Sequence, residues 1–315
     1  MPTRRPSPTL LAHILLLAVV LVWGTTFTLV KAALADTTPL LFNLLRMTLA
    51  AIILAALNFG HIRHATALDL KHAAIAGIFL ALGYQFQTAG LTLTTPSKSA
   101  FITGLIVVIV PLLTLIPKLR PVTMPRPRPI SLLGALIAFT GLILLTTSPG
   151  AALFSGIGIG EALTLACALA YAFHLLTLSH AARLTSARTL GTVQIAVAAL
   201  IMLITLPLGG HPFLHLTSRL ILALAITAIL ATAAAFTIQS WAQQHLSPTH
   251  TALIFTLEPV FAWLTALLLL HERLGRRALT GAALILGGIL ITELWPASSP
   301  QSLHPNQEAE VVQDI

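Results

Sequence analysis

The sequence predicts an all-α integral membrane protein with ten transmembrane helices, arranged as two inverted repeats of five helices. Three observations favour this fold class. Ten apolar stretches of about 20 residues fill nearly the whole chain, 57% of the residues are hydrophobic and only 8% are charged, and landmark residues recur in the same order in both halves. A bilayer core needs roughly 20 apolar helical residues per crossing, whereas about a quarter of the residues in a soluble domain are charged.

The apolar stretches are separated by short polar or proline-containing joints. They occupy approximately residues 10–30, 38–58, 72–93, 99–117, 130–147, 157–178, 189–208, 219–240, 251–270 and 278–295. Each stretch is predicted to be one helix, because backbone polar groups in lipid must find partners within the segment. Almost nothing is left over to fold in water.

The joints also set the predicted domain boundaries. These are a cytoplasmic N-terminus (1–9), a first five-helix repeat (10–148), a linker (149–156), a second five-helix repeat (157–295) and a tail (296–315). The tail is rich in Pro, Ser, Gln and Glu and has no apolar face, so it is predicted to be a disordered cytoplasmic end.

The N-terminus shares features with a signal peptide. Arg4 and Arg5 precede an apolar run that ends in the small-residue sequence Ala33-Leu34-Ala35. The run is too long for the 7–15 apolar residues of a signal peptide, and it contains Trp23 and Lys31. We therefore expect a retained first helix.

Basic residues orient the chain. With the N-terminus inside, the first half places eight basic residues on the cytoplasmic side: Arg4, Arg5, Arg63, Lys71, Lys118, Arg120, Arg126 and Arg128. Only Lys31 and Lys98 oppose them, which is a positive-inside bias. The second half is partly contrary, because Arg219 and the group Arg273, Arg276 and Arg277 fall in outer joints. The high pI of 10.8 is thus read as a topology signal and not as nucleic-acid binding.

The two halves share landmarks at shifts of 147–152 residues. The matching pairs are Trp23 with Tyr171, Arg46 with Gln194, Gln87 with Gln239, Pro111 with Pro259, Gly134 with Gly281 and Gly141 with Gly288. Five spans is an odd number, so the second copy enters the membrane from the opposite side, as in many secondary transporters. The alternative, that apolar helices resemble one another by composition alone, stays open at this point.

The last part of the chain resembles a known family. Residues 256–291, TLEPVFAWLTALLLLHERLGRRALTGAALILGGILI, resemble the end of an EamA-type member of the drug/metabolite transporter superfamily. The first half agrees through VWGTTFTLVKAAL (22–34), FNLLRMTLAAIIL (42–54) and SAFITGLIVVIVPLLTLI (99–116). The resemblance covers about residues 12–292. It implies two inverted five-helix halves, a central substrate path and, usually, export of metabolites, amino acids or drugs. One departure is Lys118-Leu119-Arg120, which stands where the second copy has His271-Glu272-Arg273.

Two ionisable residues lie well inside predicted spans, where charge is costly unless it faces the bundle or water. Arg46 is a candidate anchor for a substrate carboxylate, and Glu258, followed by Pro259, is a candidate proton or cation carrier. The structural alternatives are a snorkelling arginine and a glutamate that only partners backbone groups freed by the proline. A direct pair between them is not favoured, since their positions along the spans put them at different depths.

Polar and aromatic side chains at helical spacing complete the candidate site. The predicted substrate-binding residues are Trp23, Thr26, Arg46, Tyr84, Gln87, Tyr171, His174, Gln194 and Gln239, with Glu258 as the coupling residue. Uncharged polar groups in lipid also need partners, so hydrogen bonds that merely join helices are the alternative for each one. Gly24, Gly83, Gly104, Gly281 and Gly288 are expected to permit close helix contact.

The sequence carries no enzyme motif that we recognise. His271-Glu272 begins like a zinc-protease helix, but Gly275 stands where the second histidine is required, and the single Cys167 excludes a cysteine-rich metal site. We expect no cofactor and no metal. The acids in or beside spans are only Glu161, Glu258 and Glu293.

These observations favour a multi-pass secondary transporter of the cytoplasmic (inner) membrane. We expect alternating-access export of a small metabolite or amino-acid-like solute, with proton coupling left open. An importer or exchanger, or a membrane-embedded enzyme acting on a lipid or polyprenyl substrate, is the alternative. Small-molecule solute and lipid bilayer are the expected partners, and the sequence leaves the oligomeric state undetermined.

Overall fold

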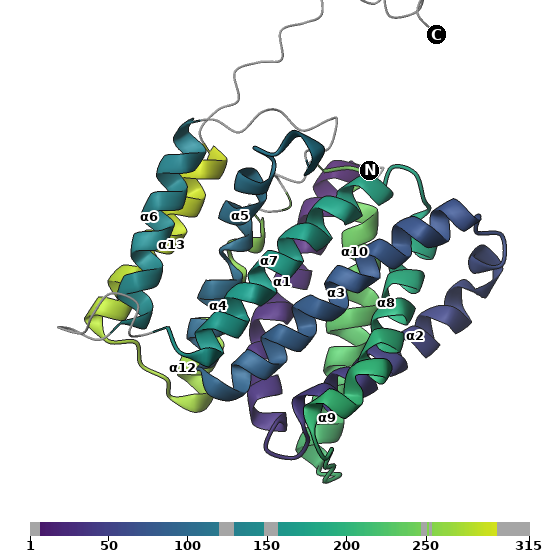
Figure 1. Ribbon diagram of the computed structural model, residues 1–315, viewed down its shortest axis with the longest axis horizontal. Coiled ribbons are helices and arrows are strands. Elements are labelled where there is room, and N and C mark those ends of the chain that lie inside the picture. Colours follow the sequence, from purple (N-terminus) through teal and green to yellow (C-terminus); the bar gives the residue numbers. More distant parts are fainter. Residues whose placement is uncertain (1–6, 120–128, 148–156, 247–250, 252–253, 295–315) are drawn as a thin grey trace, which may run out of the picture.

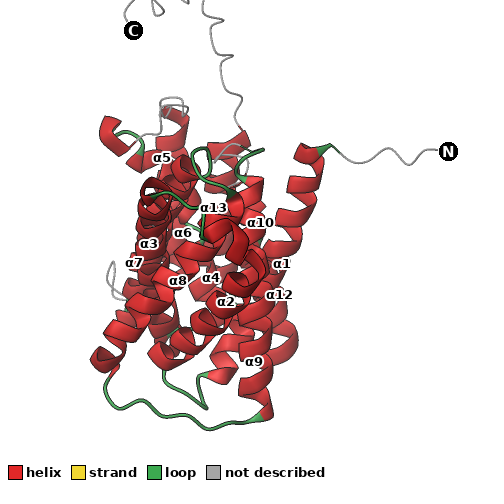
Figure 2. Ribbon diagram, turned by 90° about the vertical axis from the view of Figure 1, so that its right-hand side faces the viewer, coloured by secondary structure: helices red, strands yellow, loops and turns green. Residues whose placement is uncertain are grey.

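The computed structural model describes residues 7–119, 129–147, 157–246, 251 and 254–294, and these residues form a bundle of helices (Figures 1 and 2). The first half contains α1 (Pro8–Ala33), α2 (Pro39–Ile62), α3 (Ala67–Leu93), α4 (Pro96–Thr103), α5 (Ile106–Leu113), the 3₁₀ turn η1 (Pro117–Leu119) and α6 (Pro129–Thr146). The second half contains α7 (Ile159–Ala181), α8 (Ala187–Thr205), the 3₁₀ turn η2 (Leu206–Gly209), α9 (Ser218–Ala228), the π-helix η3 (Ile229–Ala234), α10 (Ala235–Ala242), α12 (Glu258–Leu270) and α13 (Arg276–Leu294). The predicted all-α class is confirmed for the described residues.

Seven helical segments of the described chain are long and apolar enough to cross a membrane. They are Pro8–Ala33, Pro39–Ile62, Ala67–Leu93, Pro96–Leu113, Ile159–Ala181, Ala187–Gly209 and Ser218–Ala242. The other three predicted spans coincide with α6, with the region that ends in α12, and with α13. Leu133–Thr146 in α6 and Glu258–Leu270 are apolar but shorter. The predicted linker 149–156 and tail 296–315, and the basic residues Arg4, Arg5, Arg120, Arg126 and Arg128, lie outside the described residues.

Polar residues in the joints start the helices. The side chains of Ser7, Thr66, Thr95, Ser186 and Thr217 each accept a hydrogen bond from a backbone N–H in the first turn of the helix that follows. Such caps satisfy N–H groups that the helix itself leaves unpaired. The cap at Thr66, completed by Asp69, begins α3 at Ala67, five residues before the predicted start of that span at residue 72.

Three spans that were predicted as continuous helices are interrupted. The fourth breaks at Gly104 and Leu105, and the ninth breaks at Thr256 and Leu257. Pro259 has no N–H to donate to the Phe255 carbonyl four residues earlier, which accounts for the second break. The eighth span changes to a π-helix at η3, a feature for which apolar periodicity carries no signal.

The helix ends gather at two faces of the bundle, as Figures 1 and 2 show. α1, α3, α6 and α8 begin, and α2, α7, α10 and α13 end, at what we call the N-terminal face. The joints α1–α2, α3–α4, α8–α9 and α12–α13 lie at the opposite face. There the α1–α2 and α8–α9 joints meet in an isolated β-bridge between Thr37 and Leu214.

Helices from the two halves pack against each other in corresponding pairs. α6 packs on α13, α2 packs on α8, α3 packs on α7, and α1 packs on α10 and α12. In the α6–α13 pair, Gly141 faces Gly281, and Gly288 faces Gly134. Exchanging the two copies turns the first of these contacts into the second, because Gly134 matches Gly281 and Gly141 matches Gly288.

The glycines expected to permit close packing do so. An added Cβ would lie 2.8 Å from the Glu258 carbonyl oxygen at Gly24, 2.9 Å from Pro259 at Gly104 and 2.6 Å from the Gly141 carbonyl oxygen at Gly281. At Gly83 it would meet the Tyr171 ring, and at Gly288 it would meet α6.

Candidate functional site

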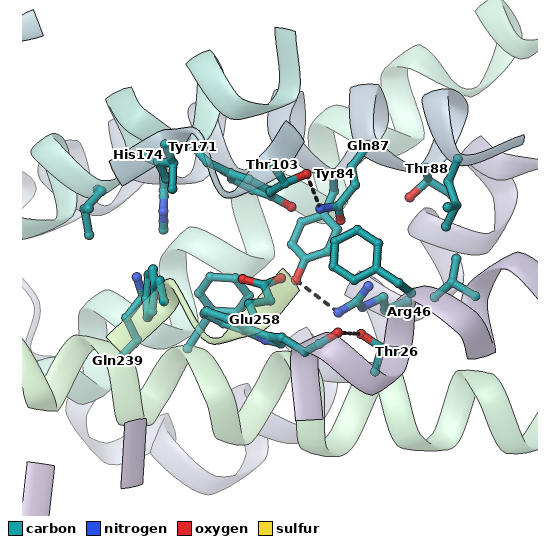
Figure 3. A pocket seen from close by; sticks show the side chains of 18 residues that line it. Thr26, Arg46, Tyr84, Gln87, Thr88, Thr103, Tyr171, His174, Gln239 and Glu258 are labelled. Carbon is teal, nitrogen blue, oxygen red and sulfur yellow. Dashed lines mark hydrogen bonds between the residues drawn. The ribbon is translucent and has the colours of Figure 1, made fainter. Parts of the chain in front are cut away.

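A central cavity of about 70 Å³ lies between the two halves of the chain. Nine of the ten predicted site residues line it: Trp23, Thr26, Arg46, Tyr84, Gln87, Tyr171, His174, Gln239 and Glu258. Figure 3 shows Arg46 of α2, Tyr84 and Gln87 of α3 and Glu258 of α12 converging on this space. The cavity has room for several water molecules or for part of a small ligand.

The cavity wall consists largely of residues in corresponding positions of the two copies. The lining pairs are Trp23 with Tyr171, Thr26 with His174, Phe27 with Leu175, Tyr84 with Phe236, Gln87 with Gln239 and Thr103 with Phe255. The shift is 148 residues for the first three pairs and 152 for the others. Each half therefore supplies the same part of its own fold to the cavity.

Four aromatic rings form a chain across the middle of the cavity. The Tyr171 ring lies 5.7 Å from Tyr84, Tyr84 lies 6.1 Å from Phe236, and Phe236 lies 5.4 Å from Trp23, measured between ring centroids. Exchanging the copies maps this chain of contacts onto itself. Rings in tilted or edge-on contact pack favourably, and their faces offer apolar surface to a ligand.

Arg46 is buried, with 3% of its surface exposed, and is held by three hydrogen bonds. Its Nε donates to Thr232 Oγ1 (2.7 Å), and its Nη2 donates to the Tyr84 hydroxyl (3.0 Å) and to the Ala231 carbonyl (3.3 Å). The guanidinium carbon also lies 4.3 Å from the centroid of the Tyr84 ring. None of these bonds uses Nη1, so this nitrogen is the group of Arg46 that a ligand can engage.

The π-helix η3 supplies two of the acceptors for Arg46. The Ala231 carbonyl accepts from Arg46 and also from the indole Nε1 of Trp23 at 2.9 Å. π-helical turns are rare and occur often at functional sites. The Ala231 carbonyl in this turn thus connects two residues of the first half, Trp23 on α1 and Arg46 on α2, to the second half of the chain.

Gln194 is the one predicted site residue that does not line the cavity. It lies behind the wall, where its Oε1 is 2.9 Å from His174 Nε2 and its Nε2 donates to Ser240 Oγ at 3.3 Å. Gln194 is fully buried, whereas its counterpart Arg46 reaches the cavity with a longer side chain. The structure thus places Gln194 as a support for His174.

Glu258 begins α12 immediately after the break in the ninth span, and its side chain faces the cavity. Among the described residues, the ion pairs are Lys98–Glu161 and Asp36–Arg219, so Glu258 and Arg46 line one cavity without forming an ion pair. No cluster of three or more His, Cys, Asp or Glu residues suited to a metal ion occurs within the described ranges.

Sequence reasoning missed Phe236, Phe255 and Thr103 as cavity residues. The shift of 152 residues that relates Gln87 to Gln239 also relates Tyr84 to Phe236 and Thr103 to Phe255. Carrying the candidate Tyr84 across the repeat would have found Phe236, whereas Thr103 and Phe255 correspond to each other and neither was a candidate. The repeat could not predict the roles of Thr232 and the Ala231 carbonyl, because the first copy has no π-helix at the corresponding place.

Comparison with known proteins agrees with this architecture. The model of the EamA-like transporter family matches residues 10–147 and, again, residues 158–294. The chain belongs to the EamA-like transporter family. The resemblance seen in the sequence is confirmed, in keeping with the drug/metabolite transporter superfamily.

This EamA-like chain has a curated relative in Archaeoglobus fulgidus, named "uncharacterized transporter", which is 34% identical over 285 residues, or 90% of this chain and 86% of the relative. A solved crystal structure superposes with a TM-score of 0.65 at 19% sequence identity and covers 90% of this chain and 96% of the other. The likeness to that structure concerns the fold alone. Family and relative together make the protein a multi-pass membrane transporter for small molecules and point away from an enzyme.

Proposed function

We propose that this protein is a secondary active exporter of a small amino-acid-like solute in the cytoplasmic membrane. It would cross the membrane ten times as two inverted five-helix repeats and work by alternating access. The observation that carries the proposal is the central cavity, in which a guanidinium and a carboxylate lie among aromatic rings between the two halves.

The inverted repeat is supported by three independent observations. The family model matches the chain twice, the α6–α13 glycine contacts exchange between copies, and six corresponding pairs line one cavity. An odd number of spans per copy places the copies in opposite orientations. The cavity then lies where the two halves move against each other.

The charged groups of the cavity fit a zwitterion. Arg46 Nη1 would take the carboxylate of the solute, Glu258 would take its ammonium, and the rings of Trp23, Tyr84 and Tyr171 would contact its apolar part. A charge-assisted hydrogen bond is roughly twice as strong as a neutral one, so both ends of such a solute would contribute to selectivity. Release of the ammonium would leave Glu258 free to bind a proton, which links solute export to proton entry.

Polar contacts join the two halves at the opposite face. Asp36 accepts from the Thr217 hydroxyl (2.7 Å) and pairs with Arg219 (2.9 Å), and Lys98 lies 3.9 Å from Glu161. The Thr217 hydroxyl, together with the Arg219 guanidinium, holds the pKa of the buried Asp36 carboxyl below its usual range. Arg219 was one of the basic residues that argued against a cytoplasmic N-terminus. Its charge is balanced by Asp36, so it is weak evidence against that orientation. The same contacts support a conformation closed on the outer side.

Counterflow in proteoliposomes tests the proposal. Vesicles loaded with a panel of unlabelled amino acids should accumulate the matching labelled amino acid, and Tyr171→Ala should raise the concentration needed for half-maximal uptake. A matched control is Leu57→Ala, since Leu57 is 76% exposed on the surface of the bundle. Counterflow of nucleotide sugars or sugars alone would reject the amino-acid-like class. Absence of counterflow for every solute, with folded protein in the vesicles, would reject a carrier.

A further inference from the structure

One face of α10 continues the polar lining of the cavity toward the N-terminal face. Gln239 lines the cavity, and Gln243 follows four residues later, one helical turn farther along the same face of the helix. Gln243 is buried, with 5% of its surface exposed. Neither its amide oxygen nor its amide nitrogen has a hydrogen-bond partner in the described part of the chain, and Gln239 Oε1 also lacks one.

Three unpaired amide atoms in adjacent turns are unusual for a protein interior. A buried polar atom without a partner costs about 1–3 kcal/mol, and nearly all such atoms in folded proteins bind protein groups or ordered water. An apolar residue at either position would avoid this cost. The two glutamines therefore indicate a place where water would be their partner, although their unpaired atoms are covered in this conformation.

The first copy lacks this polar extension. Gln239 corresponds to Gln87, but Gln243 corresponds to Leu91, which is 1% exposed and packs with Phe27 and Val30. The Leu91 carbonyl also accepts a hydrogen bond from Lys31 Nζ at 2.6 Å. Leu91 thus forms an apolar end of the cavity toward the opposite face. Its counterpart Gln243, toward the N-terminal face, carries an amide.

We propose that Gln239 and Gln243 line a water-filled passage that connects the central cavity with the N-terminal face. The cavity end at Leu91 is apolar and packed, so the passage would admit water from the N-terminal side only. The existence of the passage does not depend on the proposed function. Its role does, because the passage would give solute and protons access to the cavity from the cytoplasm.

Cysteine accessibility tests the passage without knowledge of the solute. Cys167 is the only native cysteine, so Cys167→Ala provides a thiol-free background in which Gln243→Cys and Ala242→Cys are compared. Ala242 is adjacent in sequence, fully buried and part of an apolar cluster, and is therefore a control at the same depth. The thiolate, which forms in contact with water, is the nucleophile that attacks a membrane-impermeant thiol reagent.

We expect Gln243→Cys to react at least about tenfold faster than Ala242→Cys, and only from the side that carries the N-terminus. Equal rates for the two cysteines, or reaction of Gln243→Cys only from the other side, would overturn the proposal. A carrier whose cytoplasmic access is lined by other residues would still show counterflow, so this result and the test of the proposed function can fail separately.

A second variant copies the sealed end of the first repeat. Gln243→Leu should slow the labelling of Gln239→Cys from the N-terminal side at least about tenfold, because an apolar side chain of similar size then fills the passage. The folded state is checked by the thermal unfolding temperature, which should be unchanged or higher once the unpaired amide is gone. Unchanged labelling of Gln239→Cys in a folded Gln243→Leu variant would contradict the passage.

Discussion

Arg46 illustrates how much the surroundings of one side chain decide. The sequence offered two interpretations, a substrate anchor or a snorkelling residue at the membrane border. In the structure it is 3% exposed and bound to Thr232, Tyr84 and Ala231, so it does not snorkel. Its role toward a solute is still a prediction, and it depends on Nη1.

Arg46→Lys is expected to lower transport. A lysine carries the charge but replaces the planar fork with a single nitrogen, so it cannot keep the bonds to Thr232, Tyr84 and Ala231 and also offer a donor to the cavity. Hydrogen bonds to charged groups contribute about 1.5–3 kcal/mol, which corresponds to a roughly 10- to 100-fold loss in transport efficiency. Initial uptake rates at several solute concentrations measure it. Native rates in the lysine variant would assign Arg46 to packing.

Glu258→Gln is expected to remove the pH dependence of transport while the protein still inserts and folds. The amide keeps the shape and the hydrogen-bonding capacity of the carboxyl group but does not titrate in the physiological range. Uptake into inverted vesicles with and without an imposed proton gradient measures the effect. If the gradient stimulates the glutamine variant as strongly as the native protein, Glu258 serves the break in the ninth span and not coupling.

At the scale of helices, prediction succeeded where apolar length and joints decide, and failed where a helix changes its winding. Pro259 marks the break before Glu258 only in retrospect, because a proline is also compatible with the first turn of a helix. The π-helix η3 is composed of Ile, Leu, Ala and Thr, which fit an α-helix equally well. Its winding follows from tertiary contacts such as that of Ala231 with Trp23 and Arg46.

The α6–α13 contact yields a paired prediction on one helix. Gly288→Ala should lower the free energy of unfolding by about 1–3 kcal/mol, since the added methyl group would press on the α6 backbone near Gly134 and Ala138. Gly287→Ala should leave stability unchanged or raise it slightly, because its added Cβ would meet no atom within 4 Å beyond the backbone of its own helix, and alanine favours helix. Thermal unfolding in detergent compares the two variants. Equal melting temperatures would contradict the close packing of α6 on α13.

At the scale of the whole molecule, the internal repeat was the sequence feature that related residues far apart in the chain. It related Trp23 to Tyr171 and Gln87 to Gln239, and all four line the cavity. It did not indicate that Gln194 lies behind the cavity wall, because correspondence fixes the position of a backbone but not the reach of a side chain. The longer Arg46 enters the cavity from the equivalent place, while Gln194 binds His174 behind the wall.

Topology is tested by reporter fusions at two joints. A fusion after Gly150 should report the outer side and a fusion after Arg183 the cytoplasmic side, since an odd number of spans precedes the first and an even number precedes the second. Activity of a phosphatase reporter outside and of a fluorescent reporter inside measures the two positions. The reverse pattern at both joints would reject the cytoplasmic N-terminus, and the same side at both would reject the five-plus-five arrangement.

The π-helix η3 makes this protein sensitive to chain length at one place. A π-turn holds one residue more than a turn of α-helix, and that residue sets the rotation of α10 relative to α9. Loss of the single codon for Ala233 would rewind the segment as α-helix and turn one part against the other by about 100°. Either Asp36 would lose Arg219, or the cavity would lose Phe236 and Gln239. A one-residue deletion, which surface joints commonly tolerate, is therefore expected to abolish transport when it falls in η3.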